Sequence, residues 1–222
     1  KTNLKVYWQD VEFRTFFFVV LLSAIVIIGI LFFYQHEHNV GGDVVSSLFT
    51  VTSFITTTGF VANHFASWPL FVPFLLMVLG LLGACGGSTS GGFKVVRAVV
   101  LKQHFFREMN RLIHPQGVYS LKYGNRLLPN SISDAVWAFS TAYLFVIMMS
   151  VALVMATGVG FESAFGCVSE SISNCGIGMG TYAYSAVGLG AFSKWVMMFD
   201  MIAGRLEVFT IILLFSRAFW RR

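Results

Sequence analysis

The sequence predicts an all-α integral membrane protein built from two copies of one unit, each a span, a pore helix, a filter loop and a second span. The mean hydropathy is +0.75. Hydrophobic residues make up 56% of the chain and charged residues only 11%, against roughly 25% charged residues in soluble proteins. Two Ser/Thr-rich segments interrupt the apolar runs, and their glycines, Gly59 and Gly176, stand 117 positions apart (176 minus 59). The same offset places Gly87 on Gly204, so the chain contains a repeat that is typical of a pore.

The first unit is expected over residues 1–106. Residues 13–33 form an apolar run of about 20 residues, which is enough to cross a hydrocarbon core of about 30 Å. Residues 43–54 are too short and too polar to span, so a half-crossing helix buried in protein fits better. A second apolar stretch runs from residue 68 to residue 101. The glycine-rich run 83–92 should break it, because each glycine costs a helix about 1 kcal/mol relative to alanine.

A basic connector over residues 107–129, punctuated by proline and glycine, separates the two units. The second unit, residues 130–222, follows the same order. It has a span at 132–157, a short segment at 162–173, the second glycine motif, and a last span at 187–219.

The distribution of basic residues predicts the orientation in the membrane. Of 15 Lys and Arg, three open the chain, seven lie between the units and three end the chain. The positive-inside rule therefore places both termini and the connector in the cytoplasm, and the pore helices enter from the outer face. This bias accounts for most of the net charge of +5, so no nucleic-acid partner is expected.

Other features of the chain give no sign of a different class of protein. Cys85, Cys167 and Cys175 lie in apolar stretches without metal-ligand spacing, and we expect them to be small packing residues. The first apolar run lacks a small-residue cleavage site, so no removed signal peptide is expected. A start at Lys1 rather than at methionine suggests a fragment.

The two glycine loops are candidates for an ion filter. Removing water from a small cation requires a ring of oxygens, which backbone carbonyls on a loop can supply. Glycine allows such a loop to turn its carbonyls inward, and the pore helix ahead of it directs a partly negative C-terminal end toward the ion. A plain reentrant turn is the alternative. The candidate filter residues are Thr57, Thr58, Gly59 and Phe60 in the first loop and Asn174, Cys175, Gly176 and Ile177 in the second.

Four segments together resemble the Trk/Ktr/HKT superfamily of potassium transporters, and within it the TrkH/TrkG type. They are TTTGF at 56–60, GACGGSTSGGFK at 83–94, SNCGIG at 173–178 and AGRLEVFT at 203–210. That family folds as four repeats around one pore, each with one key glycine. The resemblance implies that this chain holds the third and fourth repeats, half of a pseudo-four-fold cation pore. Gly59 and Gly176 would then be filter glycines.

The resemblance also implies the setting of the protein. It implies potassium uptake across the bacterial cytoplasmic (inner) membrane by a multi-pass protein, with K⁺ at the filter and no covalent cofactor. The implied partners are the lipid bilayer, a second copy of the subunit in a homodimer, and a cytoplasmic nucleotide-binding regulatory ring. Only two repeats are present, so the other two would be missing, cut off or supplied by another polypeptide.

A gate is implied beneath the filter. The run of Gly86, Gly87, Ser88, Thr89, Ser90 and Gly91 resembles the family's intramembrane loop, although tight helix packing through small residues is the alternative. Arg205 is a permanent cation inside a span, which normally faces a cavity or a partner. The resemblance implies that Arg205 contacts the loop, whereas an ion pair with Asp200 or Glu207 would be purely structural. Glu170 is expected to brace the second loop.

Two further interpretations remain. The chain could be a non-conducting scaffold, or half-subunit, that needs an N-terminal partner. An intramembrane hydrolase using Ser88 or Ser90 is disfavoured, because the nucleophile motif Gly-x-Ser-x-Gly would have Thr89 at its centre. We therefore expect no enzymatic activity. Preference between K⁺ and Na⁺, and channel-like against coupled transport, are left open by the sequence.

Overall fold

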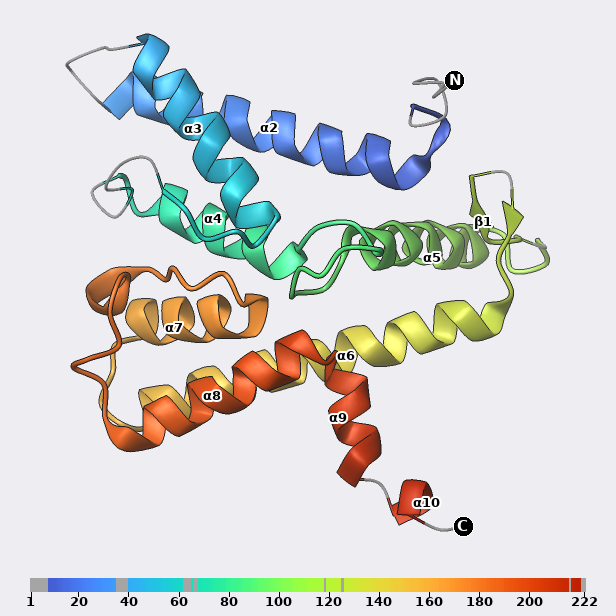
Figure 1. Cartoon of the computed structure of the whole chain (residues 1–222). Helices are drawn as coiled ribbons and strands as arrows, with labels where there is room; N and C mark the ends of the chain where they lie inside the picture. The colour runs from blue at the N-terminus through green and yellow to red at the C-terminus, as the bar shows by residue number, and fades with distance from the viewer. Residues whose placement is uncertain are drawn as a thin grey trace, which may run out of the picture.

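A computed structural model describes residues 8–34, 40–61, 65, 68–117, 119–124, 126–215 and 217–220. The prediction of a helical protein is confirmed (Figure 1). In chain order the helices are α2 (Val11–Tyr34), α3 (Val40–Ile55), α4 (Phe71–Leu82), α5 (Val95–Ile113), α6 (Asn130–Met155), α7 (Phe161–Ser173), the short 3-10 turn η2 (Gly180–Tyr182), α8 (Ala191–Arg205), α9 (Val208–Phe215) and α10 (Arg217–Trp220). The strands β1 (Lys122–Tyr123) and β2 (Arg126–Leu127) form a small antiparallel hairpin that the sequence did not predict.

Helices α2 and α6 are the two described helices that are long and apolar enough to cross a membrane, judged by length and composition. They have 24 and 26 residues, and at 1.5 Å per residue each is longer than a hydrocarbon core of about 30 Å. Pro129 directly precedes α6 with φ −65°, the value its ring imposes, which suits the start of a helix. Both helices agree with the expected first spans of the two units.

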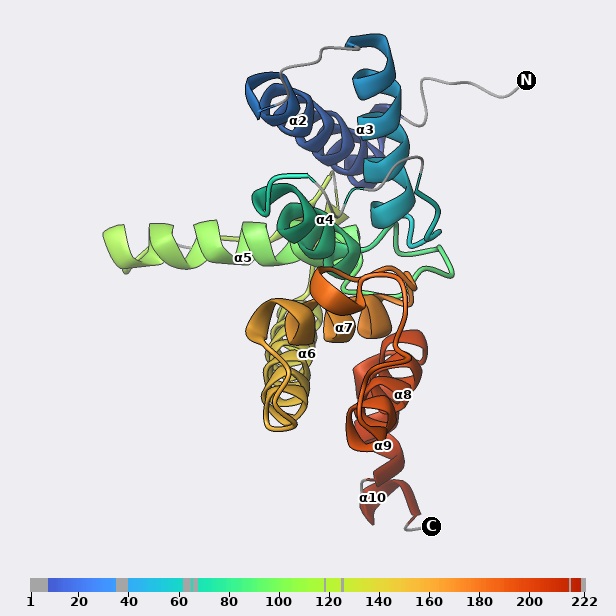
Figure 2. The ribbon, with the colours of Figure 1, turned by 90° about the vertical axis from the view of Figure 1, so that its left-hand side faces the viewer.

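The helices form two groups that meet at α4 and α7. Helices α2, α3 and α4 pack together on one side, and α6, α7 and α8 on the other (Figure 1). Figure 2 shows α4 and α7 adjacent at the centre, where they pack against each other. Each group has its own apolar core, but the core of the first group also contains Cys175, Ile177 and Met179 from the second glycine motif. The two groups are therefore joined by the loops and not only by helix contacts.

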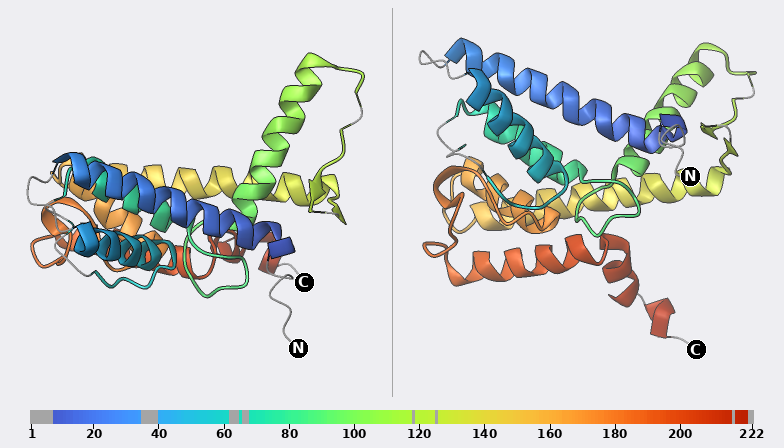
Figure 3. Two further views of the ribbon diagram at one scale, coloured as in Figure 1. Left: turned by 90° about the horizontal axis from the view of Figure 1, so that it is seen from above. Right: turned by 45° about the horizontal axis from the view of Figure 1, so that its top comes forward.

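Helix α5 projects outward from the other helices. Figure 3 shows it projecting steeply away from α2, α4 and α6. It runs without interruption from Val95 to Ile113, so the connector predicted to begin at residue 107 starts inside a helix. Large apolar side chains on it are exposed within this chain, among them Phe105, Phe106 and Leu112.

The last predicted span is interrupted. Instead of one helix over residues 187–219, α8 ends at Arg205 and α9 begins at Val208. Between them Glu207 has φ +61°, a left-handed conformation that L-residues other than glycine seldom adopt. Neither glycine nor proline occurs among residues 205–208, so the sequence carried none of the usual signals for this bend.

Candidate functional site

The two glycine loops have the same backbone conformation. Thr57 and Asn174 both adopt the left-handed region, with φ of 54° and 57°. Two residues later, Gly59 and Gly176 have φ of 80° and 78°. Each pair is separated by 117 positions, the offset at which the sequence repeats (174 minus 57). The sequence repeat is therefore also a repeat of loop geometry.

Matching hydrogen bonds produce this shared conformation. Thr58 donates its N–H to the Ser53 carbonyl at 2.8 Å, and Cys175 donates to the Glu170 carbonyl at 3.1 Å. One residue earlier, the N–H groups of residues 57 and 174 bond to the carbonyls of residues 54 and 171, at 3.0 and 3.1 Å. Together these bonds make a Schellman motif, which ends a helix through one left-handed residue.

Side-chain hydroxyls add a third matching bond. Thr56 Oγ1 donates to the Thr52 carbonyl and Ser173 Oγ donates to the Ser169 carbonyl, both at 2.6 Å. Hydroxyls often bond in this way to the carbonyl four residues earlier in a helix. The carbonyls of residues 52–54 near the end of α3 and of residues 169–171 near the end of α7 thus accept hydrogen bonds from their own chain.

The two glycine loops contact each other. A Cβ added to Gly59 would overlap the carbonyl oxygen of Cys175, so only glycine fits at this contact. Around Gly176 nothing lies within 4 Å of such a Cβ, and there glycine is required by φ alone. The structure therefore brings two of the candidate filter residues, Gly59 and Cys175, into direct contact. That they bind an ion stays a prediction.

The other candidate filter residues have different surroundings. Ile177 is buried in the core of the first helix group, whereas the Phe60 side chain is exposed. Asn174 donates its side-chain amide to the Met201 carbonyl at 3.2 Å, which ties the second loop to α8. Thr58 Oγ1 bonds to Thr56 Oγ1 at 2.8 Å, so the hydroxyls of the first loop interact with each other.

A residue that the sequence did not single out supports the first loop from behind. Ser53 accepts a hydrogen bond from the Phe60 N–H through its Oγ atom at 2.8 Å. Its counterpart at the 117-residue offset is Glu170, which lies against the second loop, since a Cβ at Gly178 would be 2.8 Å from Glu170 Oε2. The offset itself was the signal that could have identified Ser53.

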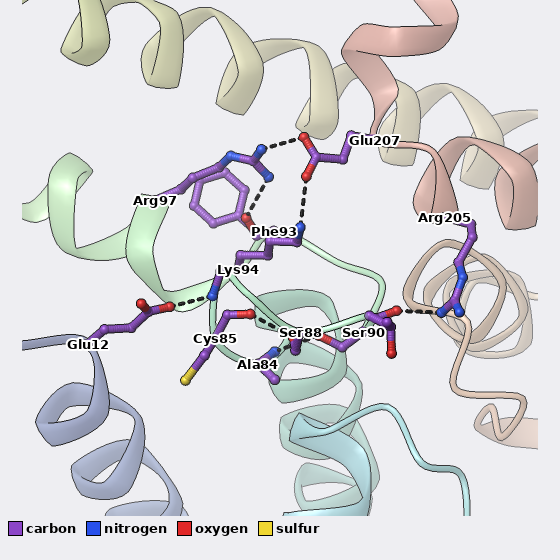
Figure 4. Close-up of polar contacts among 12 residues, drawn as sticks. Glu12, Ala84, Cys85, Ser88, Ser90, Phe93, Lys94, Arg97, Arg205 and Glu207 are labelled. Atoms are coloured by element: carbon purple, nitrogen blue, oxygen red, sulfur yellow. Dashed lines mark hydrogen bonds and ion pairs between the residues drawn. The ribbon is translucent and has the colours of Figure 1, made fainter. Parts of the chain in front are cut away.

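The glycine-rich segment between α4 and α5 is a loop over residues 83–94, as the run of glycines indicated. Its internal bonds are made by two serines (Figure 4). Ser88 Oγ donates to the Cys85 carbonyl at 2.6 Å and shares a bond of 2.7 Å with Ser90 Oγ. Ser90 Oγ also accepts from the Ala84 N–H at 3.3 Å. The loop therefore has a defined shape of its own.

Charged side chains hold this loop from outside. Glu12, in the first turn of α2, accepts a hydrogen bond from the Gly86 N–H. Arg205, at the end of α8, donates to the Thr89 carbonyl. Figure 4 shows Glu12 and Arg205 approaching the loop from opposite sides. Glu12 was missed in the sequence, although it is an acidic residue in a basic N-terminal segment and at the start of a span.

The same loop touches the second glycine motif. A Cβ at Gly91 would overlap the Ser173 carbonyl and lie 3.2 Å from Asn174 Nδ2. The backbone of the loop therefore packs directly against the end of α7. By contrast, nothing lies within 4 Å of a Cβ at Gly87, so the glycines of this loop do not all serve close packing.

Among the described ion pairs, none joins Arg205 to Asp200 or Glu207, the two partners that a structural role would involve. Glu207 pairs with Lys94 and Arg97. Asp200, which is fully buried, accepts a hydrogen bond from Ser150 Oγ at 2.7 Å. The contact between Arg205 and the loop is therefore present, while its role in gating stays a prediction.

Comparisons with known proteins agree on one family. The family described as TrkH, a cation transport protein, matches residues 2–222. The chain is 43% identical to the Trk system potassium uptake protein TrkH of Salmonella typhimurium, over 99% of this chain and 45% of that protein. It is 30% identical to TrkG of Escherichia coli K12, over the whole chain and 45% of that protein. These relatives are named as transport proteins and not as enzymes.

A solved structure is also similar. The crystal structure of the potassium transporter TrkH from Vibrio parahaemolyticus superposes with a TM-score of 0.91 at 39% identity. The match covers 98% of this chain and 47% of that one. The chain therefore spans about half the length of the relatives that it matches.

Proposed function

Since the chain belongs to the TrkH family of cation transport proteins, we propose that it supplies the third and fourth repeats of a pore for potassium uptake. The observation that carries the proposal is the pair of glycine loops. They share φ values at matched positions and touch where Gly59 meets Cys175. Two equivalent loops at one level are what a ring of carbonyl ligands around a common axis requires.

Carbonyls of the loops would replace the hydration shell of the ion. The carbonyls of Ser53, Phe54, Glu170 and Ser171 are engaged in the Schellman bonds. The proposed ligands are the carbonyls of the candidate filter residues, 57–60 and 174–177, with hydroxyls of the first loop as further candidates. Glu170 would support the second loop, as Ser53 does the first, and not contact the ion.

The loop over residues 86–91 is the proposed gate. It packs against the end of α7 through Gly91 and is held by Arg205 through the Thr89 carbonyl. A cation just below a cation filter would oppose ion passage, both by its charge and by keeping the loop in place. Movement of this loop would open the path.

We propose an integral protein of the bacterial inner membrane, with both termini and the connector in the cytoplasm. A second copy of the subunit and a cytoplasmic nucleotide-binding ring are proposed partners. The basic side chains of residues 107–129, among them Arg107, Arg111 and Lys122, form the proposed docking surface for the ring. Potassium is the transported ion, and no covalent cofactor is proposed.

The hydrolase alternative receives no support from the loop serines. Ser88 and Ser90 bond to each other and to backbone groups. Among the described contacts, none joins either hydroxyl to a histidine or a carboxylate, which a serine nucleophile needs. The rubidium uptake experiment described next distinguishes a non-conducting scaffold from a transporter.

The test uses a chimera in which this chain replaces the matching portion of the Vibrio parahaemolyticus relative. Radioactive rubidium uptake would be measured in bacteria that lack potassium uptake systems. We expect uptake by the chimera, and a changed preference for rubidium over sodium when Gly59→Ala is introduced. Gly29→Ala is the matched control, because nothing lies within 4 Å of a Cβ at that site in α2. A well-folded chimera that takes up no rubidium, or a Gly59→Ala variant with unchanged preference, would contradict the proposal.

A further inference from the structure

Lys94 and Glu207 share two unusual properties. Each has a positive φ, of 74° and 61°, although neither is glycine. Their side chains form an ion pair, with Lys94 Nζ 2.8 Å from Glu207 Oε1. A left-handed conformation is unfavourable for a residue with a Cβ and persists only where the surroundings enforce it. The ion pair links two such positions that are 113 residues apart in the chain.

Both residues stand where a helix begins. Lys94 is the last residue of the loop 83–94 and directly precedes α5. Glu207 lies in the bend between α8 and α9, two residues after Arg205. The ion pair therefore connects the downstream end of the proposed gate to the bend in the last span. Arg205 holds the same loop at Thr89, so the end of α8 and the bend that follows it hold the loop at two points.

Arg97 is a second cation that pairs with Glu207, and the three side chains form a charged network. Its Nη2 atom lies 2.6 Å from the second carboxylate oxygen of Glu207, so each oxygen of this carboxylate has its own cation. The Arg97 guanidinium also donates to the Phe93 carbonyl at 3.3 Å and lies 3.9 Å from the centre of the Phe139 ring in α6. Figure 4 shows Lys94 and Arg97 converging on Glu207.

This network differs from an ordinary surface ion pair. The side chains of Lys94 and Arg97 are only 17% and 19% exposed, and that of Glu207 is 37% exposed. Partial burial weakens the screening of these charges by solvent. Because two cations share one carboxylate, removing the carboxylate would leave two positive charges close together. Glu108 in α5 is likewise shared by Arg107 and Arg111, but these pairs join neighbouring positions of one helix and connect no separate parts of the chain.

We propose that Lys94, Arg97 and Glu207 act as a charged latch, a set of positioning residues that keeps the loop of residues 86–91 against the filter. This inference rests on the proposed function of that loop. The latch holds the start of α5 to the bend between α8 and α9. Because α5 projects from the rest of the chain (Figure 3), a displacement of α5 would be transmitted to the loop through Lys94. Breaking the latch favours the conducting state.

The first test is Glu207→Gln in the chimera described above. Rubidium flux per molecule should rise roughly five-fold or more, a typical size for one coupling between two conformations. Preference for rubidium over sodium should stay unchanged, because the filter is not altered. A merely structural role predicts lower flux, so the direction of change separates the two roles. Asp134→Asn is the matched control, since this exposed carboxylate near the start of α6 takes part in none of the described ion pairs, and it should leave basal flux unchanged.

Lys94→Gln provides a second variant should Glu207→Gln fail to fold, and it should also raise the flux. The double variant should show no further increase beyond the larger single effect, because one ion pair cannot be broken twice. Unchanged or lower flux in a folded single variant, or fully additive effects in the double variant, would overturn the latch. If the unaltered chimera takes up no rubidium, or Gly59→Ala leaves the ion preference unchanged, the proposed function fails instead.

Discussion

Gly59 and Cys175 touch through their backbones, at a distance that leaves no room for a Cβ atom on residue 59. This contact joins the two glycine loops, and it sets them apart in one respect. Gly59 is required by space and by its φ of 80°, whereas Gly176 is required only by its φ of 78°. The two positions are equivalent in sequence but not in packing.

This difference predicts that alanine substitutions at the two glycines lower the stability of the protein by different amounts. Gly176→Ala should cost about 1–2 kcal/mol through backbone strain alone. Gly59→Ala should cost at least about 2 kcal/mol more, because the new methyl group must displace the Cys175 carbonyl. Thermal unfolding of the two purified variants in detergent would show which of them loses more stability. Equal losses of stability would show that the contact between the loops does not exist in the folded protein.

Gly204 should be among the least replaceable residues of α8. A Cβ there would overlap the Ile172 carbonyl of α7, and backbone cannot yield as a side-chain tip can. Gly204→Ala is expected to destabilise the protein by about 3 kcal/mol through separation of α7 and α8. Gly29→Ala, also within a helix but with open space around it, should be neutral or slightly stabilising. Circular dichroism melting of both variants would check this, and similar melting temperatures would contradict it.

Arg205→Ala should raise ion flux. The variant loses the hydrogen bond to the Thr89 carbonyl and removes a positive charge from the proposed ion path, so the loop is held less firmly and repels cations less. We expect an increase of roughly five-fold or more in rubidium uptake by the chimera. Arg14→Ala, at an exposed arginine of α2 that takes part in none of the described ion pairs, serves as the control. Unchanged or lower flux in a correctly folded Arg205→Ala protein would count against a gating role.

Thr57→Gly should stabilise the end of α3. Threonine is β-branched and poorly suited to its φ of 54°, and glycine removes that strain. We expect a gain of about 1 kcal/mol. Asn174→Gly should gain less or lose stability, because asparagine tolerates the left-handed region and its side chain also bonds to the Met201 carbonyl. A chemical-denaturation comparison that gave Asn174→Gly the larger gain would refute this account.

The local features of the loops could be predicted because they are encoded locally. A single offset of 117 positions matched the two glycines, and the Ser/Thr-rich helix ends make the same hydrogen bonds, whereas the left-handed conformation of Thr57 and Asn174 was not predicted. The glycine-rich loop between α4 and α5 was likewise evident, since such a run cannot continue a helix.

Other features depend on residues far apart in the chain and left no local pattern. The bend at Glu207 is accompanied by ion pairs to Lys94 and Arg97 in another helix, and its own segment contains no glycine or proline. Glu12 bonds to Gly86, 74 positions away. Helix α5 continues through the predicted connector boundary because its propensity is uninterrupted up to His114-Pro115. The hydrophobic periodicity of the sequence does not reveal tertiary contacts of this kind.

Cys175, Ile177 and Met179 fill the apolar interior that otherwise consists of α2, α3, α4 and their connections. During synthesis, the helices of the first unit would emerge long before these three side chains do. The apolar core of the first helix group would therefore lack three of its buried side chains until residue 179 has been synthesised. The final packing of the first unit thus depends on the second, so the two units reach their folded state together.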